Sequence, residues 1–418
     1  MLKVVHISFS DKIGGASIAA YRHNESLIRN GIDSKMLVSK QRNSINDSIQ
    51  AVTYSIFERI KKSICDRILS RIYRNLNPIA SYSLAIDGMK VHRHPYVLNA
   101  DLIILHWINF STISLWEIKS LLKLGKPVVW YCHDMWPFTG GCHYSFDCTK
   151  FCTICKDCNQ VKKHYIDFTN IQFLLKKKLW SKYNAHLTIA APSNWLINES
   201  RRSDLFKYHK HYLLPNVIDT ELYRPTNKYG DREKWGLNKN KIIILFCADN
   251  IDSRYKGWEY LRECLNMLPS HQYECLVIGR VNSKIYSEIA INVTFTGYIG
   301  NEKELVSAYN ASDISVLPSL ADNYPNVIVE SMACGVPCVA FDSGGIKDLV
   351  IHMNTGYLVK KRDALALRRG IEVLSNDKAL IHRLSLSARK YIESNCSYNL
   401  AKMRYFDLYK YCVKEQVE

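Results

Sequence analysis

Long apolar runs are missing from this sequence, and none reaches the roughly 18 residues that a membrane-spanning helix needs. Internal repeats and low-complexity tracts are also missing, which argues against a solenoid or a disordered chain. Acidic residues are scarce, since 39 Asp and Glu stand against 56 Lys and Arg and the formal net charge is +17. That charge favours anionic partners. The basic residues do not form a dense run interleaved with aromatic residues, so nucleic acid is not an expected partner.

The start of the chain is not expected to be a leader. Residues 1–9 are too short for a signal peptide, carry no cleavage site and are typical of a first strand. Cytoplasmic residence is therefore the expected location. With 418 residues, 47% hydrophobic and 23% charged, the chain is long enough for two domains with separate cores.

The first half alternates short apolar stretches with helix-like stretches. We predict strands at residues 2–7, 36–38, 102–105, 128–132 and 187–191. This alternation predicts a parallel sheet covered by helices. We expect a Rossmann-like domain over residues 1–224, with a cysteine-rich loop at 140–160.

A polar, turn-rich stretch at residues 224–237 marks the expected domain boundary. A second series of strands is predicted at residues 242–246, 275–278, 293–295, 314–317 and 338–341. We expect a second Rossmann-like domain over 225–397. Residues 398–418 are predicted to form a terminal helix that returns toward the first domain. Ligand loops are expected to face a cleft between the two domains, a common location for small-molecule chemistry.

A helix with two acidic residues at its start is predicted after the apolar run 314–317. Pro325 suits the first turn of a helix and Gly335 suits its end. The bare N–H groups at such a helix start attract anions. Asp322 precedes the helix, and Glu330 follows Pro325 by about 7.5 Å along the axis at 1.5 Å per residue. The spacing suits a phosphate next to an attached ribose or sugar; the alternative is a solvated Glu and a helix-capping Asp.

Residues 57–76 form a predicted basic amphipathic helix. Ile60, Ile64, Ile68 and Ile72 recur every four residues, and Lys or Arg fills much of the remainder. Such a helix can lie on an anionic membrane surface. The alternative is a helix that packs its Ile stripe on the domain and exposes its basic side.

Five of the 14 cysteines lie between residues 142 and 158. Cys155 and Cys158 have a metal-ligand spacing, and Cys142 or Cys148 would complete four ligands of a structural zinc. The alternatives are thiols that pack a loop and redox chemistry.

Several motifs now stand in one order along the chain: Gly14-Gly15, His133-Asp134, residues 215–219, Lys256-Gly257, residues 319–337 and Gly344-Gly345. This order resembles the family 4 retaining glycosyltransferases of the GT-B fold, which have two Rossmann-like domains facing an interdomain cleft. Residues 133–144 resemble those of a bacterial subgroup that assembles polysaccharide, O-antigen and capsule. Members of this subgroup often share four of the clustered cysteines, with Cys152 the additional one.

The resemblance implies roles for the second half of the chain. Glu330 would hold the ribose hydroxyls of a nucleotide, and Asp322 would face hydroxyls of the donor sugar. Backbone N–H groups near Asn326 and Val327 would meet the diphosphate. Lys256 would stabilise the negative charge that grows on the leaving nucleoside diphosphate; the alternative is a surface lysine.

The chain departs from the family pattern at three positions. The first acid is usually Glu and is Asp322 here. The family's Arg, five residues before its Lys, is replaced by Ile251, so that role is vacant or moves to Arg254. Val217 stands where the family usually has Gly.

In the first half, the resemblance implies that His133 is an active-site histidine that hydrogen-bonds a hydroxyl of the donor sugar; the alternative is a structural histidine. Asp134 would either orient His133 or cap the following helix. Gly14 and Gly15 would allow close approach of the donor diphosphate or the acceptor.

The predicted function is retaining transfer of a sugar from a UDP- or GDP-linked donor to a saccharide acceptor in surface polysaccharide biosynthesis. No Asp-x-Asp tract is present, so no metal cofactor is expected for catalysis. A lipid-linked acceptor and peripheral association with the inner face of the cytoplasmic membrane are further expectations. The alternatives are a non-catalytic zinc-loop protein that binds an anionic polymer, and another GT-B-like enzyme such as a phosphorylase or epimerase.

Overall fold

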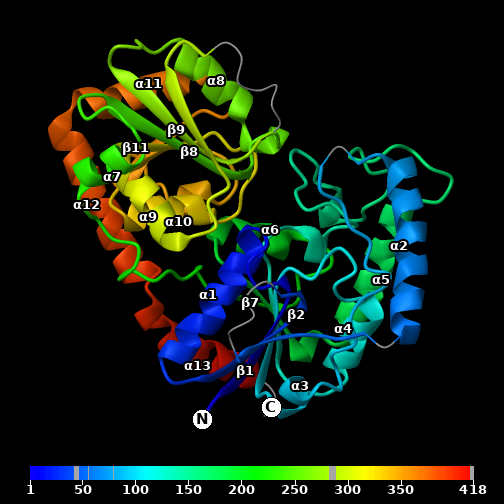
Figure 1. The fold of residues 1–418 in the computed structure, drawn as a ribbon. Helices are drawn as coiled ribbons and strands as arrows, with labels where there is room; N and C mark the ends of the chain where they lie inside the picture. The colour runs from blue at the N-terminus through cyan, green and yellow to red at the C-terminus, as the bar shows by residue number, and fades with distance from the viewer. Residues whose placement is uncertain (42–46, 55, 79, 282–288, 415–418) are drawn as a thin grey trace. The chain divides into compact units, whose positions relative to one another are not determined.

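The computed structural model describes residues 1–41, 47–54, 56–78, 80–281 and 289–414. The chain divides into two units (Figure 1). Met1–Pro215 and Asn399–Glu418 form the N-terminal unit, and Asn216–Tyr398 forms the C-terminal unit. The first boundary lies nine residues before the predicted end of the first domain at residue 224.

Backbone pairing explains the earlier boundary. Ile218 forms a parallel bridge with Ser397, and its N–H donates to the Cys396 carbonyl at 2.7 Å. Tyr223 is buried in the core of the C-terminal unit. Residues 216–224 therefore belong to the second unit, although their composition resembles a linker.

The N-terminal unit contains a seven-stranded parallel sheet in the order β3-β2-β1-β4-β5-β6-β7. Its strands are β1 (Lys3–Ser10), β2 (Asp33–Lys40), β3 (Ile49–Ala51), β4 (Leu102–Leu105), β5 (Val128–Tyr131), β6 (Leu187–Ala191) and β7 (Lys210–Leu213). Its helices are α1 (Gly15–Arg29), α2 (Ile56–Leu76), α3 (Pro95–Asn99), α4 (Leu115–Leu122), α5 (Phe168–Lys182) and α6 (Asn194–Arg202). Short 3-10 helices are η1 (Trp136–Phe138), η2 (Lys150–Cys152) and η3 (Asn184–His186). β4, β5 and β6 are buried throughout, as expected of central strands covered on both faces.

The C-terminal unit contains a six-stranded parallel sheet in the order β10-β9-β8-β11-β12-β13. Its strands are β8 (Ile242–Asn250), β9 (Tyr273–Arg280), β10 (Asn292–Gly297), β11 (Ile314–Leu317), β12 (Cys338–Phe341) and β13 (Gly356–Val359). Its helices are α7 (Lys228–Lys234), α8 (Trp258–Asn266), α9 (Glu302–Ala311), α10 (Asn326–Ala333), α11 (Ala364–Asn376) and α12 (Lys378–Asn395). The 3-10 helices are η4 (Arg254–Lys256) and η5 (Ile346–Asp348).

Each sheet has one point where the strand order reverses. The point lies between β1 and β4 in the N-terminal unit, and between β8 and β11 in the C-terminal unit. Open parallel sheets bind ligands outside the carboxyl ends of the strands at such points. The loops that follow these four strands are therefore the expected ligand loops of each unit.

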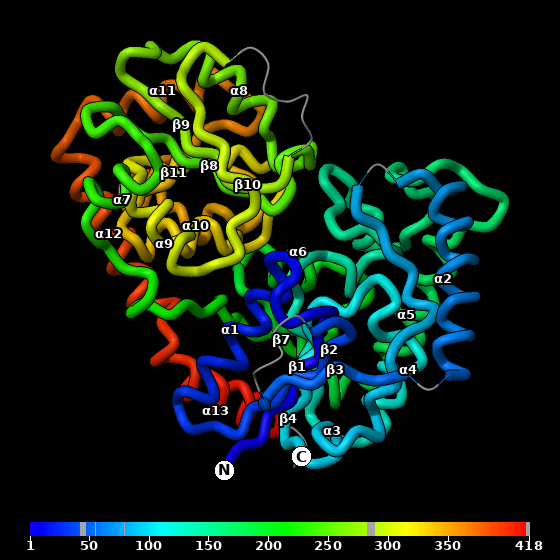
Figure 2. The backbone as a smooth tube through the Cα atoms, viewed as in Figure 1, coloured from blue at the N-terminus to red at the C-terminus, as the bar shows by residue number. Residues whose placement is uncertain are grey.

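The last helix packs on the N-terminal unit (Figure 2). After η6 (Tyr398–Leu400), α13 (Ala401–Val413) buries Ala401, Tyr405, Leu408 and Cys412 in one cluster with residues of β1, β4 and β5. The chain thus leaves the N-terminal unit after β7 and returns to it with α13. Residues 415–418 of the predicted terminal helix lie outside the described residues.

α2 does not pack through its Ile stripe. Ile60, Ile64 and Ile68 are 52 to 56% exposed, whereas Leu69 and Leu76 are buried against Tyr82 and neighbouring residues. The predicted packing alternative was therefore wrong for these three isoleucines, because the buried side of α2 is offset around the helix from the Ile stripe. No helix within the described residues has the length and apolar character needed to cross a bilayer.

Candidate functional site

The start of α10 is the centre of the candidate site in the C-terminal unit. Pro325 is the N-cap residue, with φ −66° and ψ 122°, and Gly335 follows the helix with φ 72°. Side-chain atoms of Asn216 fix this start: Nδ2 donates to the Tyr324 carbonyl at 3.2 Å and to Asn326 Oδ1 at 3.1 Å. The N–H groups of the first helical turn, which include those of Asn326 and Val327, cannot all be satisfied within the helix.

Glu330 is the fifth residue of α10 and is only 5% exposed. The hydroxyl of Tyr309, on α9, donates to Glu330 Oε2 at 2.7 Å. Burial and the adjacent carboxylate raise the pKa of Tyr309 far above its usual value, so its hydroxyl stays a donor. Glu330 is thus a buried, oriented carboxylate, and the solvated-Glu alternative is wrong.

Lys256 and Asp322 form an ion pair with Nζ and Oδ2 2.6 Å apart. Lys256 ends η4 after β8, and Asp322 lies in the loop after β11, so the pair spans the point of strand reversal. Burial lowers the pKa of Lys256, but the charge of Asp322, the neighbouring Tyr255 and the hydrogen bond to Asp322 together outweigh it, so the pKa is raised. Lys256 therefore stays charged. Asp322 is not the cap of α10, because Pro325 is the N-cap residue and the Asp322 carboxylate pairs with Lys256.

Backbone contacts hold the two loops together. Gly257, with φ 74°, lies so close to Pro318 that an added Cβ would stand 1.9 Å from the Pro318 carbonyl oxygen. The N–H of Leu320 donates to the Tyr255 carbonyl at 2.7 Å. Only glycine fits at position 257, and this close approach positions the neighbouring Lys256.

Asp322 is fixed from a third loop as well. The N–H of Gly345 donates to the Asp322 carbonyl at 3.0 Å, and a Cβ added to Gly344 would meet the same oxygen at 2.2 Å. The motif Gly344-Gly345, after β12, thus supports the carboxylate of the candidate site.

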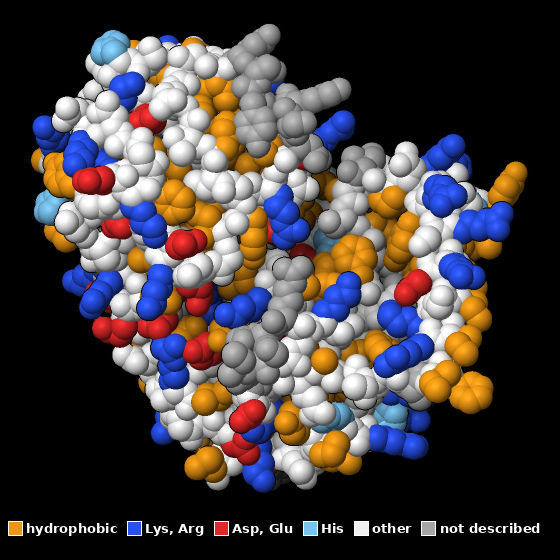
Figure 3. Space-filling view, viewed as in Figure 1, with side chains coloured by type: hydrophobic (Ala, Val, Ile, Leu, Met, Phe, Trp, Pro, Cys, Tyr) orange, Lys and Arg blue, Asp and Glu red, His pale blue; other side chains and the backbone are white. Residues whose placement is uncertain are grey.

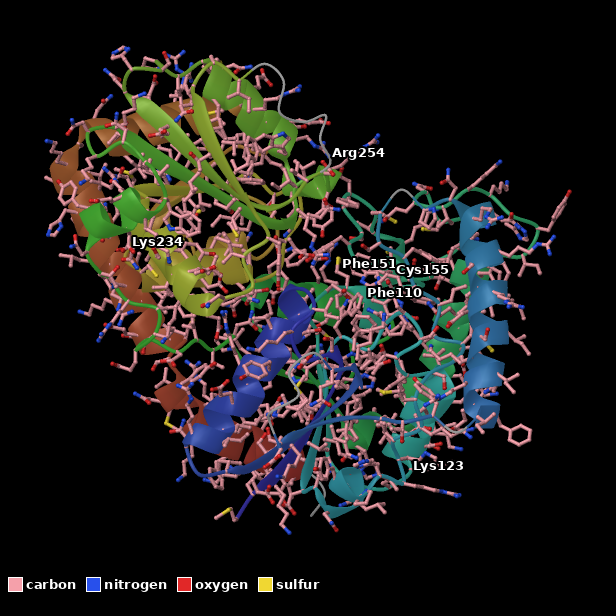
Figure 4. The ribbon with its side chains drawn as sticks, viewed as in Figure 1. Phe110, Lys123, Phe151, Cys155, Lys234 and Arg254 are labelled. Atoms are coloured by element: carbon pink, nitrogen blue, oxygen red, sulfur yellow. The ribbon has the colours of Figure 1, made fainter. Side chains whose placement is uncertain are left out.

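The position of the family's Arg is apolar here. Ile251 is buried in the core of the C-terminal unit and does not reach the site. Arg254 lies in η4, two residues before Lys256, and is exposed (Figure 4). Arg254 is close enough to Lys256 in sequence to approach an anion bound beside Lys256. Within the described residues, however, it forms no ion pair that assigns it to the candidate site.

Gly14 and Gly15 open α1 in the N-terminal unit. Gly14 is the N-cap residue with φ 80° and ψ 162°, a conformation that is essentially restricted to glycine. A Cβ added to Gly14 would meet no atom within 4 Å. The space beside this backbone is open, as the close approach of a ligand requires.

His133 lies two residues after β5 and is partly buried. Burial lowers its pKa to about 4, so the imidazole is neutral at pH 7. The neighbouring Asp134 accepts from the N–H of Trp136, the first residue of η1, at 2.9 Å and pairs with His143 Nδ1 at 2.6 Å. Asp134 therefore braces the turn after β5, whereas the N-cap residue of η1 is Met135.

Cys142, Cys148, Cys155 and Cys158 line one small cavity and are free thiols (Figure 4, which labels Cys155). Burial raises the pKa of Cys155 to about 12 and raises that of Cys142 further. Among the residues described, no group of three or more His, Cys, Asp or Glu side chains is spaced to hold a metal ion. The four thiols thus share one cavity.

α2 presents a mixed basic and apolar surface at the edge of the N-terminal unit (Figure 3). A hollow along it is lined by Arg59, Lys62, Ser63, Asp66, Arg67, Ser70, Arg71 and Arg74. The exposed Phe57, Ile60, Ile64 and Ile68 lie beside this basic strip.

Sequence reasoning did not single out Tyr309 or Asn216 as individual site residues. Tyr309 lies 21 residues from Glu330, and Asn216 lies 110 residues from Asn326. No local spacing indicates either contact. Only the quoted motif at residues 215–219 pointed to the region of Asn216.

The second half of the chain is similar to a known protein family. Residues 227–391 match the family model of glycosyl transferases group 1. This range contains Lys256, Asp322 and Glu330, the three charged residues of the candidate site.

Two curated relatives are similar over about half of the chain. The capsular polysaccharide biosynthesis glycosyltransferase CapM of Staphylococcus aureus is 30% identical over 54% of this chain and 62% of its own length. The N,N'-diacetylbacillosaminyl-diphospho-undecaprenol alpha-1,3-N-acetylgalactosaminyltransferase of Campylobacter jejuni is 29% identical over 50% of this chain and 62% of its own. The chain thus matches less than two thirds of the length of either relative.

A solved structure resembles the whole chain. The structure of HepE of Anabaena, in complex with UDP-glucose, aligns over 98% of this chain and 99% of its own length. The TM-score is 0.64 and the sequence identity is 15%. At that identity the likeness concerns the fold. The chain therefore has the GT-B fold, and its residues 227–391 match the glycosyl transferases group 1 model, in line with the resemblance found in its motifs.

Proposed function

We propose that the protein transfers a sugar from a nucleotide-sugar donor to a saccharide acceptor in the biosynthesis of a surface polysaccharide. The observation that carries the proposal is the Lys256–Asp322 pair beside the start of α10, at the carboxyl ends of β8 and β11. These residues lie in the range that matches the glycosyl transferases group 1 model. The names of the two curated relatives support a role in glycan assembly.

The C-terminal unit would bind the donor nucleotide. Lys256 and the first N–H groups of α10 would supply positive potential to the diphosphate. Glu330, oriented by the hydrogen bond from Tyr309, would accept from ribose hydroxyls. Because HepE is in complex with UDP-glucose, a UDP-linked donor is the first expectation and a GDP-linked donor the second.

Transfer would retain the anomeric configuration by a front-face route. The acceptor hydroxyl attacks the anomeric carbon from the side on which the diphosphate leaves. The bond to the acceptor oxygen forms, the bond to the phosphate oxygen breaks, and the departing phosphate oxygen takes the acceptor proton. Asp322, which is paired with Lys256, orients a sugar hydroxyl and is not a nucleophile. Lys256 stabilises the charge of the leaving group.

A panel of nucleotide sugars tests donor binding. A ligand at 100 times its Kd stabilises the folded state by about 2.7 kcal/mol, which a thermal shift detects. We expect a UDP-sugar to stabilise the wild type and Lys234→Ala, a change at an exposed lysine, but not Lys256→Ala. Product analysis by NMR then establishes the anomeric configuration, and activity is expected to survive EDTA. If no nucleotide sugar stabilises the protein, the proposal fails.

The acceptor would be lipid-linked and reached at the inner face of the cytoplasmic membrane. The basic and apolar face of α2 suits the surface of an anionic bilayer, and the name of the Campylobacter relative includes a diphospho-undecaprenol acceptor. In flotation assays we expect binding to vesicles that contain phosphatidylglycerol but not to pure phosphatidylcholine. Replacing Ile60 and Ile64 by Ser should weaken binding about tenfold. Leu365→Ser, at an exposed leucine of α11, is the matched control.

The four cysteines Cys142, Cys148, Cys155 and Cys158 would bind a structural zinc once deprotonated. The metal would bring the thiolates together, which offsets the raised pKa values of the free thiols. Elemental analysis of purified protein is expected to give one zinc per chain, and Cys155→Ser should lose it. A metal content near zero would leave the four residues as packed thiols. Salt-dependent binding of an anionic polymer, without uptake of any nucleotide sugar, would favour the non-catalytic alternative.

A further inference from the structure

Three imidazoles form a continuous hydrogen-bonded chain across the sheet of the N-terminal unit. His6 lies within β1, His106 follows β4 directly and His133 follows β5 by two residues. His6 Nδ1 and His106 Nε2 are 2.8 Å apart, and His106 Nδ1 and His133 Nε2 are 3.0 Å apart. Since β1, β4 and β5 are consecutive in the sheet, the chain runs from the middle of β1 to His133 beyond the carboxyl end of β5.

All three rings are neutral at pH 7. His6 and His106 are completely or almost completely buried. Burial lowers the pKa of His6 to about 3 and that of His106 well below its usual value, and it lowers the pKa of His133 to about 4. A neutral imidazole carries one N–H and one acceptor nitrogen.

This neutrality couples the two hydrogen bonds. His106 uses both ring nitrogens in the chain, so one nitrogen donates and the other accepts. Either both N–H groups donate in the direction of His133, or both donate in the direction of His6. The tautomer of His133 is therefore tied to that of His6, although these two residues do not share a bond in the chain.

The far end of the chain indicates the direction. His6 Nε2 is buried and has no hydrogen-bond partner in the described part of the chain. Bonds that point toward His6 would place a proton on this atom and leave a buried donor unsatisfied. Bonds that point toward His133 leave only a lone pair there, and buried orphan N–H donors are the rarer case in proteins.

We propose that His6 and His106 are positioning residues that hold His133 as its Nδ1–H tautomer. His6 donates through Nδ1 to His106, and His106 donates through Nδ1 to His133 Nε2. His133 is then a neutral hydrogen-bond donor through Nδ1, which makes it a donor to the hydroxyl of a bound sugar. That last step rests on the proposed function, whereas the tautomer does not.

A neighbouring histidine provides a matched control. His23, on α1, is fully buried and its ring lies 6.1 Å from that of His106, but both of its nitrogens lack a partner in the described structure. It also packs on Tyr131 and Tyr405. His23→Leu removes an imidazole from the same buried cluster without removing a bond of the chain.

Histidine tautomers are directly visible in long-range ¹H–¹⁵N correlation spectra of ¹⁵N-labelled protein, with His133→Gln to assign the His133 signals. We expect the Nδ1–H pattern for His133 in the wild type and in His23→Leu. His106→Leu and His6→Leu should shift it toward Nε2–H or a mixture, and His6→Asn, which keeps a donor near the Nδ1 position, should restore it. An Nε2–H pattern in the wild type overturns the proposal even if no variant folds.

Kinetics separate this inference from the proposed function. In sugar transfer, His106→Leu should lower kcat about tenfold or more with KM little changed, because the loss of an oriented donor costs on the order of one hydrogen bond. His23→Leu should stay near the wild type. An unchanged kcat in His106→Leu overturns the assignment of His133 as a sugar donor. A wild type with the Nδ1–H pattern but no nucleotide-sugar uptake sinks the proposed function and leaves the histidine chain intact.

Discussion

In the N-terminal unit, the residues at the point of strand reversal are neutral imidazoles, whereas in the C-terminal unit they are an ammonium and a carboxylate 2.6 Å apart. His106, His133, Lys256 and Asp322 all follow the carboxyl end of a parallel strand. The described histidines of the C-terminal unit, His271, His352 and His382, are exposed instead. The same sheet edge thus supports a neutral hydrogen-bonding surface in one unit and a charged one in the other.

The two sets of residues suit different kinds of ligand group. A diphosphate requires positive potential, which Lys256 and the start of α10 supply. A sugar carries no charge and is recognised by oriented hydrogen bonds, which neutral imidazoles provide without the cost of burying ions.

The largest expected effect lies in the charged unit. Lys256→Ala, Asp322→Asn and Glu330→Gln should each lower sugar transfer about 100-fold or more, since removal of one preorganised electrostatic contact typically costs that much. Initial rates with the donor found by thermal shift provide the measurement. Lys234→Ala is the control for loss of a surface charge. Full activity in all three variants would remove the basis for a charged C-terminal site.

A backbone change tests how the charged pair is positioned. Gly257→Ala would place a Cβ 1.9 Å from the Pro318 carbonyl oxygen at a φ of +74°, so we expect a loss of about 3 kcal/mol of stability. Gly300→Ala is the matched control, because its added Cβ would stand 3.5 Å from the nearest atom. Urea unfolding measures both. Equal stability of the two variants would show that the loops yield more easily than their contacts indicate.

The comparison also shows what could be read from the sequence. β4, β6, β11 and β12 begin and end where their apolar runs do, because central strands of a parallel sheet are buried on both faces. β3, β7 and β13 were not predicted. They are short strands at sheet edges. β3 and β7 carry polar residues, and the apolar stretch of β13 is only three residues long, so no long apolar run marks them.

The charged residues of the candidate site were easier to predict than the neutral ones. Lys256, Asp322 and Glu330 stand in motifs with local spacing, whereas the partners of His133 come from β1 and from the end of β4, up to 127 positions earlier in the chain. One available signal was overlooked. His106 follows the apolar run 102–105 in the same way that His133 follows 128–132, and parallel strands bring both to one edge.

As the pH falls, the N-terminal unit should lose stability before the C-terminal unit does. The pKa of His6 is about 3 in the folded state and near 6.5 in the unfolded chain, so below pH 6.5 the unfolded state binds more protons. The stability from this burial is complete above pH 6.5 and is lost progressively as the pH falls toward 3, by about 1.4 kcal/mol per pH unit for each such histidine. For His6 alone, we expect the free energy of unfolding to fall by about 2 kcal/mol between pH 6.5 and pH 5.

Hydrogen exchange, corrected for the intrinsic rate at each pH, measures this loss in both units separately. Amides of β1, β4 and β5 should lose protection between pH 7 and pH 5, and those of β8, β11 and β12 should change less. His23→Leu should reduce the pH dependence of the N-terminal unit, since burial keeps the pKa of His23 well below its usual value. Parallel losses in both units would mean that buried histidines do not set acid stability.

The smallest effect is expected at Gly14, the counterpart of Gly257 at the first strand of the other unit. Its φ of 80° and ψ of 162° strain any other residue, but an added Cβ would meet no atom within 4 Å. Gly14→Ala should therefore cost about 1 kcal/mol in urea unfolding, from backbone strain alone. Gly31→Ala is the control, because its φ of 74° and open surroundings are similar and it lies at the far end of α1. If the open space beside Gly14 admits a ligand, Gly14→Ala should reduce transfer while Gly31→Ala does not, although the two variants lose similar stability. Equal activity in both would leave strain as the sole reason for glycine at position 14.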